Sequence, residues 1–395
     1  MKRSLLITAI ITVLLVSFGS SIYGGNITGV TEKTVKIGSD IDLTGPSGVQ
    51  GIGCNIGIES YFNYVNDSGG IHGRKIEYVV EDNGYQPAKA VAAMKKLLYR
   101  DKVFAPFTWG TVCILAVANE VKKENVPIIG IAASDAYHKP FRPHIFSFLV
   151  SQQRQAIAVA DYIFNTMKPK DLRLGCLYQD DEYGRSGVRG LKAAAKRYGI
   201  ELVETAGFKR DAVNHTSQII QVKRAGANYV YIGTVIRHAS GILKEANKLG
   251  WHPQFFGNHG SSDRKVIELA GEAARGYMGC RYITDLDDTA SGVSKVRDMI
   301  LKYHKSLKRT GGLTIAGWVG AMLMSEGLKR SGRDLTRDGL MDAFETMKSF
   351  DPDGLMPPLT WGPKRREGGR GVRIAKADLE KKVFVPVTDW IVPAD

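Results

Sequence analysis

The first candidate for ligand chemistry is the run Thr108, Trp109, Gly110 and Thr111, which joins an apolar strand-like stretch to a helical one. The start of a helix presents backbone N–H groups without partners inside the helix, together with the positive end of its dipole, and both favour an anion. The threonines add hydroxyl donors, and the tryptophan adds a flat apolar face. We therefore predict that this run binds a carboxylate; a threonine that simply caps the helix is the alternative.

The chain lacks the motifs by which many enzymes are recognised. It contains no H-E-x-x-H or C-x-x-C run, so the common zinc and redox signatures are missing, and it contains no G-x-S-x-G nucleophile elbow. Gly51, Gly53 and Gly57 have the spacing G-x-G-x-x-x-G, which differs from the dinucleotide-binding G-x-G-x-x-G. We expect a binding protein rather than an enzyme, with no catalytic residue, no metal and no cofactor.

The first residues predict export from the cytoplasm. Lys2 and Arg3 precede a largely apolar run at residues 5–18, and small residues follow it. A run of this length spans about 21 Å of helix, which is short of the roughly 30 Å of a bilayer core. The pattern is typical of a cleavable signal peptide over residues 1–24, and an uncleaved anchor is the alternative. We therefore expect the mature chain in a periplasm, where nucleotide cofactors are scarce.

Apolar strand-like runs alternate with helical runs along the chain. Strand-like runs lie at residues 34–42, 75–81, 103–107 and 127–133, and a second set begins after residue 150. Strands separated by helices of about 10–15 residues indicate parallel βαβ units that are covered on both faces. We predict an α/β fold of two doubly wound lobes with mainly parallel sheets. The first lobe comprises residues 34–149 and 284–358, and the second comprises residues 150–283 and 359–395.

A hinge of three crossover strands is expected between the lobes, near residues 148–151, 282–285 and 359–362. Open α/β sheets bind ligands outside the carboxyl ends of their strands, where loops and helix N-termini meet. Both sets of strand ends can then face one cleft. We expect the solute to bind in this cleft and the hinge to bend around it.

The charge of the chain is strongly basic but dispersed. The formal net charge is +14, and the only local basic run is Lys364, Arg365 and Arg366. We interpret these charges as a solvated surface, with an attraction for anionic solutes or lipids as the alternative. Nucleic acid is not expected as a partner, because the basic residues form no larger patch along the sequence.

Four cysteines are too few for a disulfide scaffold in a chain of 395 residues. An oxidising compartment nevertheless permits a single bridge. Cys54 and Cys113 both lie near the predicted cleft side of the first lobe, so a bridge between them is one candidate. Cys176 and Cys280 lie in apolar strand-like runs, where buried thiols are expected.

Short motifs follow one another in a characteristic order from Lys36 to about Trp361. They are L-T-G-P at residues 43–46, N-x-x-G-G-I-x-G-R-K at 66–75, E-D-N-x-x-x-P at 81–87, V-P-I-I-G at 126–130, Y-Q-D-D-x-Y-G at 178–184 and E-A-N-K-L-G-W at 245–251. In their order and spacing the chain resembles the periplasmic solute-binding proteins of ABC importers, of the leucine/isoleucine/valine-binding type. The resemblance implies a two-lobed protein that closes over a small solute.

The resemblance also implies binding residues at further strand ends. Ser134 stands where members of the family bind the α-amino and carboxylate groups of the solute, and Tyr183 matches a tyrosine that closes over it. For Asp135 a capping role is the alternative, and for Tyr183 a packing role. The full candidate set is Gln50, Thr108, Trp109, Gly110, Thr111, Ala133, Ser134, Asp135, Tyr183, Ile236, Asn258 and His259.

The sequence departs from the family pattern at His259, where amino-acid binders of this type carry a glutamate that pairs with the ammonium group of the solute. Val235 and Ile236 likewise stand where a polar tyrosine would be expected, and Gln50 replaces another. An ion pair excluded from water needs its partner. We therefore expect a carboxylate without an amine, aromatic or aliphatic, as a rival to a branched-chain amino acid. Asp135 or Asp181 can still supply the negative charge, and His259 without ligand contact is the alternative.

Together these observations predict the solute-binding component of an ABC importer. It is expected to act as a monomer, to capture a small carboxylate-bearing solute in the periplasm, and to deliver it to a membrane permease. A sensing module that passes ligand state to a receptor is the alternative, which the sequence does not separate from import.

Overall fold

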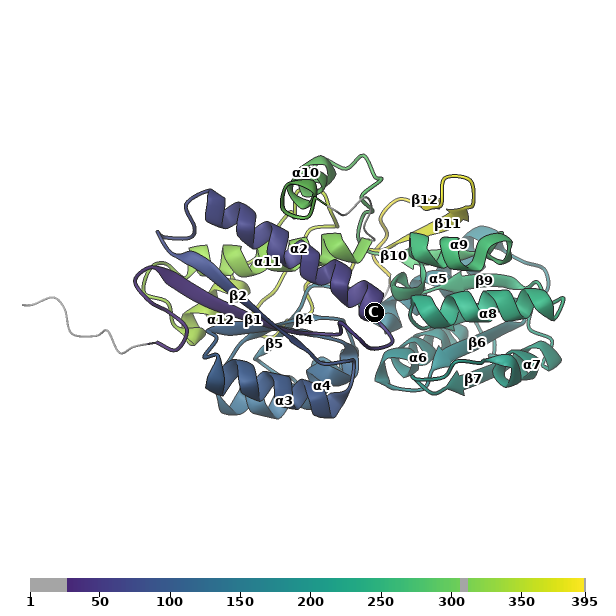
Figure 1. Ribbon diagram of the computed structural model, residues 1–395. Coiled ribbons are helices and arrows are strands. Elements are labelled where there is room, and N and C mark those ends of the chain that lie inside the picture. The colour runs from purple at the N-terminus through teal and green to yellow at the C-terminus, as the bar shows by residue number, and fades with distance from the viewer. Residues whose placement is uncertain (1–26, 306–311, 394–395) are drawn as a thin grey trace, which may run out of the picture.

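The computed structural model describes residues 27–305 and 312–393, so the predicted signal peptide lies outside the described residues. Figure 1 shows two lobes side by side, each built on its own sheet. The chain builds most of the first lobe, then the second, returns to the first and finally adds two strands to the second sheet. The prediction of an α/β fold with two doubly wound lobes is confirmed.

The first sheet has the strand order β2-β1-β3-β4-β5, and its neighbouring strands are all parallel. The edge strand β5 was not among the predicted strands, because its three residues give no run long enough to indicate a strand. The strands are β1 (Thr34–Ile41), β2 (Lys75–Asp82), β3 (Ala105–Trp109), β4 (Ile128–Ile131) and β5 (Ile145–Ser147).

Helices cover both faces of the first sheet. On one face, α2 (Gly48–Asp67) and α11 (Gly312–Arg330) share a large apolar core with the strands. On the other face, α3 (Pro87–Lys95) and α4 (Thr111–Lys123) enclose a separate core. Since α11 comes from the C-terminal part of the chain, two distant stretches build this lobe (Figure 1). The other helices of this lobe are α10 (Val293–Tyr303) and α12 (Arg337–Glu345).

The second sheet has the strand order β12-β11-β10-β9-β8-β6-β7. Strands β6 to β10 pair in parallel, whereas β11 and β12 join the edge as an antiparallel hairpin. The strands are β6 (Leu174–Gln179), β7 (Glu204–Phe208), β8 (Tyr229–Gly233), β9 (Gln254–Gly257), β10 (Met278–Arg281), β11 (Arg373–Asp378) and β12 (Val383–Pro386).

The helices of the second lobe again divide between two faces. α5 (Gln152–Tyr162) and α6 (Glu182–Arg197) pack on the face whose core is continuous with that of the first lobe. α7 (Thr216–Arg224), α8 (Ile236–Lys248) and α9 (Arg264–Ala270) cover the other face and its separate core. The shared core includes residues of the first two crossovers, such as Phe148 and Ile283, so it ties the two lobes together.

The third crossover lies later in the chain than the sequence predicted. Leu359 pairs with Phe350, and the Trp361 ring packs edge-on against Phe146 of β5 at 5.4 Å, so this stretch still belongs to the first lobe. The chain passes toward the second sheet only after Glu367, which bridges to Ser147. The apolar run at residues 359–361 was interpreted as a crossover strand, but the burial of Trp361 anchors it in the first core.

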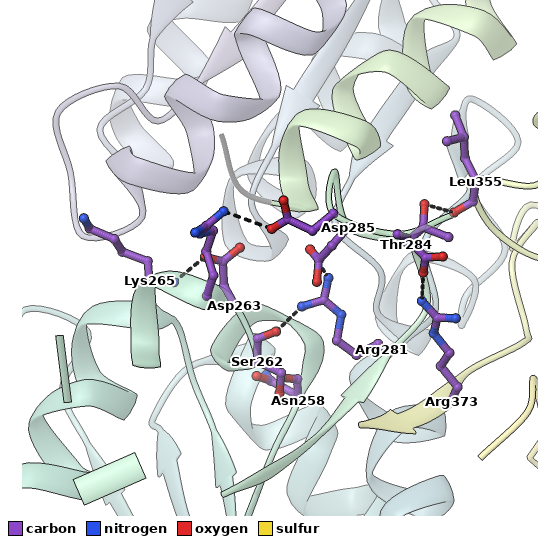
Figure 2. Close-up of polar contacts among 12 residues, drawn as sticks. Asn258, Ser262, Asp263, Lys265, Arg281, Thr284, Asp285, Leu355 and Arg373 are labelled. Carbon is purple, nitrogen blue, oxygen red and sulfur yellow. Dashed lines mark hydrogen bonds and ion pairs between the residues drawn. The ribbon is translucent and has the colours of Figure 1, made fainter. Parts of the chain in front are cut away.

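The second crossover carries a set of ion pairs that we call the hinge clasp. Figure 2 shows Arg281 at the end of β10 with its guanidinium between the Ser262 carbonyl and the Asp285 carboxylate. Beside it, the Arg373 guanidinium of β11 contacts Asp288 at 2.5 Å. The Thr284 N–H donates to Leu355 O at 2.9 Å and so ties the same segment to the first lobe. Charges of the second lobe thus hold the segment that leads back into the first.

The predicted bridge between Cys54 and Cys113 is wrong. Both thiols are free and buried, as are those of Cys176 and Cys280. Cys54 lies in the core beneath α2 and Cys113 in the core beneath α4, on opposite faces of the first sheet. The sequence predicted that both residues lie at the same end of the first sheet, but it could not show that they lie on opposite faces of it. Burial raises the pKa of each of the four thiols, which keeps them protonated.

Candidate functional site

A cavity lies between the lobes, at the carboxyl ends of β3 and β4 and the N-terminal ends of α4, α5 and α6. Its volume is about 40 Å³, whereas pockets that hold small molecules typically measure ~300–1,000 Å³. Entry of a solute therefore requires the lobes to move apart. The lining residues are Ser47, Gln50, Tyr85, Trp109, Gly110, Thr111, Ile131, Ala132, Ala133, Leu149, Gln152, Tyr183, Val235, Gly260, Tyr282 and Leu313.

Part of the sequence-predicted set lines this cavity. These residues come from the starts of α2, α4 and α6 and from the ends of β3 and β4. Because such positions follow directly from a strand-to-helix junction, local sequence was sufficient to find them. They are Gln50, Trp109, Gly110, Thr111, Ala133 and Tyr183. Their contact with a solute remains a prediction.

Trp109 is held in place by a chain of two hydrogen bonds. Its indole Nε1–H donates to Ser47 Oγ at 3.0 Å, and the Ser47 hydroxyl donates to Asp42 Oδ2 at 2.6 Å. The Ser47 backbone N–H donates to the same carboxylate oxygen at 2.8 Å, so the loop before α2 closes around Asp42. The indole therefore presents a fixed face to the cavity while its only donor is satisfied.

The turn into α4 needs the glycine that the sequence provides. Gly110 has a positive φ of 91°, and a Cβ at this position would meet the ring of Tyr85 at 2.6 Å. Gly110 and Thr111 line the cavity, and the first N–H groups of α4 have no partners inside the helix. The buried Thr111 hydroxyl beside them has no hydrogen-bond partner within the described residues. This turn thus keeps the donors that an oxyanion requires.

Three of the predicted residues lie close to the cavity but do not line it. The Thr108 side chain points to the opposite face of β3, where Asp40 is its neighbour in the register. The Ser134 hydroxyl donates to Glu182 Oε1 at 2.7 Å, across the gap between the lobes. Asp135 lines a different hollow beside the hinge.

Asn258, His259 and Ile236 also stand outside the lining. The Asn258 amide donates to Tyr183 OH at 3.1 Å, so it positions a lining residue. The His259 ring stacks on Tyr282 with centroids 3.9 Å apart and does not reach the cavity. Burial, with the nearby arginines, lowers the pKa of His259 well below its usual value, so the imidazole is neutral. Ile236 packs in the core beneath α8.

Sequence reasoning missed lining residues that lie far apart in the chain. Tyr85 follows β2 in a left-handed conformation (φ 55°), an unusual backbone state for a tyrosine and a signal only the structure reveals. Gln152 opens α5, and a helix start after a predicted crossover is a signal that the sequence does contain. Tyr282 lies on a crossover and Leu313 on α11, and only the tertiary fold brings them here.

No charged side chain is found among the described residues that line the cavity. Two aspartates stand behind the lining, but both are occupied. Asp42 accepts the hydrogen bonds of Ser47, and Asp181 caps α6 by accepting the N–H of Tyr183 at 3.0 Å. Burial raises the pKa of Asp181. A solute ammonium group would therefore find no facing carboxylate to replace its hydration.

The structure has the two lobes in contact across the cavity. The Gln50 amide donates to the Gly260 carbonyl oxygen at 2.9 Å, and the Gln179 amide donates to Tyr85 OH at 3.4 Å. The Arg210 guanidinium lies 5.2 Å from the centre of the Tyr85 ring. Each of these contacts joins a residue of one lobe to a residue of the other, so they stabilise the closed arrangement.

The family of the chain follows from comparison with known proteins. A model of the periplasmic binding protein family matches residues 34–382, and the chain belongs to this family. Its fold is that of the type I periplasmic binding proteins. The family consists of substrate-binding proteins, which gives the chain a solute-binding role consistent with an ABC importer.

Individual relatives are similar over most of their length. The Leu/Ile/Val-binding protein of Escherichia coli (strain K12) is 22% identical over 336 residues, which cover 84% of this chain and 88% of the relative. The Leu/Ile/Val-binding protein homolog 1 of Brucella abortus (strain 2308) is 24% identical over 293 residues, which cover 73% and 75%.

Solved structures share the fold. A fatty acid ABC transporter substrate-binding protein from Thermomonospora curvata superposes with a TM-score of 0.83 at 24% identity and covers 92% of this chain and 94% of its own. A branched chain amino acid ABC transporter from Thermus thermophilus, with bound valine, has a TM-score of 0.83 at 21% identity, with 93% and 98% covered. At these identities the similarity shows the fold alone.

Two further observations concern metals and membranes. Within residues 27–305 and 312–393, no group of three or more His, Cys, Asp or Glu side chains is arranged to hold a metal ion. Over the same residues, no helix has both the length and the apolar character that a membrane crossing requires.

Proposed function

We propose that the chain is the extracytoplasmic solute-binding component of an ABC importer that captures a small carboxylate-bearing solute. The solute carboxylate is expected at the N-terminus of α4, on the free N–H groups beside Thr111. Its apolar part is expected against Trp109 and Tyr183. The signal-peptide pattern of the first residues supports a periplasmic location, and the family supports delivery to a membrane permease.

The absence of any charged side chain from the described lining carries the proposal on solute class. Transfer of an ammonium group out of water without a partner is costly in free energy, whereas a carboxylate can accept hydrogen bonds from the N–H groups at the start of α4. A carboxylate that lacks an amine, aromatic or aliphatic, therefore fits the cavity better than a plain α-amino acid. The similar structures include a fatty acid ABC transporter substrate-binding protein and a branched chain amino acid ABC transporter with bound valine. The fold is therefore compatible with acids that lack an amine and with amino acids.

A thermal-shift screen of amino acids, aromatic acids and aliphatic acids tests this proposal. Acids without an amine should raise the unfolding temperature more than leucine or valine, and should change the tryptophan fluorescence. Trp109→Leu should abolish both signals, whereas Trp251→Leu, which lies in the second lobe beside Phe255, should retain them. Micromolar binding of leucine would contradict the inference on solute class, and no binding by any solute would contradict the proposed function.

A further inference from the structure

A second hollow, which we call the hinge pocket, shares no lining residue with the cavity between the lobes. Its volume is about 390 Å³, within the range of ~300–1,000 Å³ that is typical of small-molecule pockets. Its walls are the loop after β4, the first turn and a half of α5, and residues 364–370, which lead into the third crossover. That last stretch contains the basic run Lys364, Arg365 and Arg366, for which a solvated surface was predicted.

The hinge pocket is strongly basic. Among the described residues that line it, six cationic side chains stand against two carboxylates, those of Asp135 and Glu367. The cations are Lys139, Arg154, Lys364, Arg365, Arg366 and Arg370. Such an excess of positive charge inside one concave surface attracts anions.

Part of this charge is already neutralised within the chain. Arg154 pairs with Glu367 at 3.2 Å, and their side chains are each 12% exposed. The buried Arg366 guanidinium contacts Glu345 at 2.5 Å and donates to Pro143 O at 2.7 Å. These two arginines therefore form the base of the pocket, and the pocket as a whole keeps an excess of positive charge.

The ammonium groups at the rim remain unpaired. Lys139 and Lys364 are exposed, and neither contacts a carboxylate within the described chain. Lys139 belongs to the first lobe and Lys364 to the stretch before the third crossover, so they approach the pocket from different segments. Both can turn toward an anion, because a lysine side chain is a flexible point charge.

His138 supplies a neutral donor to the same pocket. Both of its ring nitrogens are buried and have no hydrogen-bond partner within the described residues. Burial, with the charges of Arg366 and Arg142, lowers the pKa of His138 to about 4, so one ring nitrogen carries a proton and the other does not at neutral pH. A buried polar group without a partner is unfavourable, so an oxyanion that reached either ring nitrogen would gain a hydrogen bond that the chain itself does not supply.

We propose that the hinge pocket binds a small, multiply charged oxyanion of the phosphate class. Lysine and arginine groups bind such oxygens through charge-assisted hydrogen bonds, and the His138 N–H adds a neutral one. Ile157 is the single large apolar side chain among the described lining residues, which include no phenylalanine, tyrosine or tryptophan, so an apolar solute would gain little there. The ligand class therefore differs from that of the cavity between the lobes.

Occupation of the hinge pocket should be coupled to closure, and this consequence rests on the proposed solute capture. The pocket is lined by both lobes and by a crossover, so its shape depends on the hinge angle. An anion that prefers one angle shifts the population toward it. By linkage, the anion must change the solute affinity by the same factor as the solute changes the anion affinity.

Calorimetric titration of the full chain with inorganic phosphate, at an ionic strength held constant with sodium chloride, tests the site. The double variant Lys139→Gln/Lys364→Gln should bind phosphate at least about tenfold more weakly, because two charge-assisted bonds are lost. Lys381→Gln/Lys382→Gln removes the same charge from an exposed turn between β11 and β12 and should bind like the wild type. Equal losses in both variants, or no saturable binding by the wild type, would overturn the proposal.

Vesicles distinguish a free anion from a lipid headgroup. Co-sedimentation with phosphatidylglycerol vesicles but no binding of inorganic phosphate would overturn the proposal in favour of a membrane contact. The solute screen is read independently. Phosphate binding without any solute binding would contradict the proposed function and support an anion site in the hinge pocket. Solute binding without phosphate binding would support the proposed function and contradict the anion site.

Discussion

Gln50 shows how one amide can serve both the cavity and the closure of the lobes. It lies in the first turn of α2, lines the cavity, and donates to the Gly260 carbonyl oxygen of the other lobe at 2.9 Å. The Gly260 carbonyl belongs to the loop in which His259 stands in place of the family's glutamate. This loop therefore contributes a hydrogen bond between the lobes, and it lacks the glutamate that pairs with the solute in amino-acid binders of the family.

Replacement of Gln50 by alanine should weaken closure. The variant loses one buried hydrogen bond of the closed form, so the affinity for the best solute of the screen should fall about three- to tenfold. Calorimetry measures the affinity, and small-angle scattering should report a larger radius of gyration in the variant. Gln221→Ala on the exposed face of α7 is the matched control and should leave both values unchanged. Wild-type affinity in Gln50→Ala would show that this contact does not contribute to closure.

At the scale of elements, the close packing of α2 on α11 explains the glycines that resembled a nucleotide motif. A Cβ on Gly57 would lie 2.0 Å from the Thr314 carbonyl oxygen and 2.7 Å from the Trp318 backbone nitrogen. A Cβ on Gly317 would lie 1.9 Å from the Cys54 carbonyl oxygen. The glycines allow two helices from opposite ends of the chain to touch by their backbones, so their role is structural.

Gly57→Ala should destabilise the protein, because the added methyl group forces the two helices apart. Overpacking of this kind costs about 1–3 kcal/mol in the free energy of unfolding, which denaturant titration measures. Gly53→Ala is the internal control. Its Cβ would come no nearer than 3.2 Å to another atom, the Thr314 hydroxyl oxygen, and alanine is the better helix former, so a much smaller change is expected. An equal loss in both variants would argue against the close approach as the cause.

At the scale of the whole molecule, buried ionisable groups make stability depend on pH. Asp40, at the end of β1, is fully buried, and its carboxylate oxygens have no hydrogen-bond partner within the described residues. Burial raises the pKa of Asp40 well above its usual value. The folded state thus holds this proton more tightly than the unfolded state does. The contribution of the protonated Asp40 carboxyl to stability is fully present below its pKa in the unfolded chain, and it is lost as the pH rises through its pKa in the folded chain.

Asp40→Asn should therefore raise the unfolding temperature near pH 7.5. At this pH the folded wild type must either hold a proton on Asp40 that the unfolded chain would release, or bury a negative charge. The gain should shrink as the pH falls toward about 4, the usual pKa of aspartate, because the wild-type side chain is then neutral in both states. Thermal unfolding across this range measures the difference. Asp298→Asn, an exposed position on α10, serves as control. A pH-independent difference at Asp40 would disprove the account.

Local sequence predicted the parts of the site that depend on one strand and the helix after it. Trp109 and Thr111 follow from a strand-to-helix junction, and Ala133 from the end of the next strand, because parallel strands place their carboxyl ends at one edge. Tyr85, Tyr282 and Leu313 could not be found in this way. They reach the cavity from a loop with unusual backbone geometry, a crossover and a helix of the returning chain.

The sequence alone determined the alternation of strands and helices, and therefore the parallel sheets, the two lobes and the edge where a solute should bind. These properties depend on periodicity and on turn residues, which are local. Only the tertiary structure decided that Cys54 and Cys113 stand on opposite faces of a sheet, that His259 turns away from the cavity, and that the basic run at residues 364–366 meets Arg154 in one pocket. Such relations depend on how distant segments pack, and packing distances are not encoded in any short stretch of the chain.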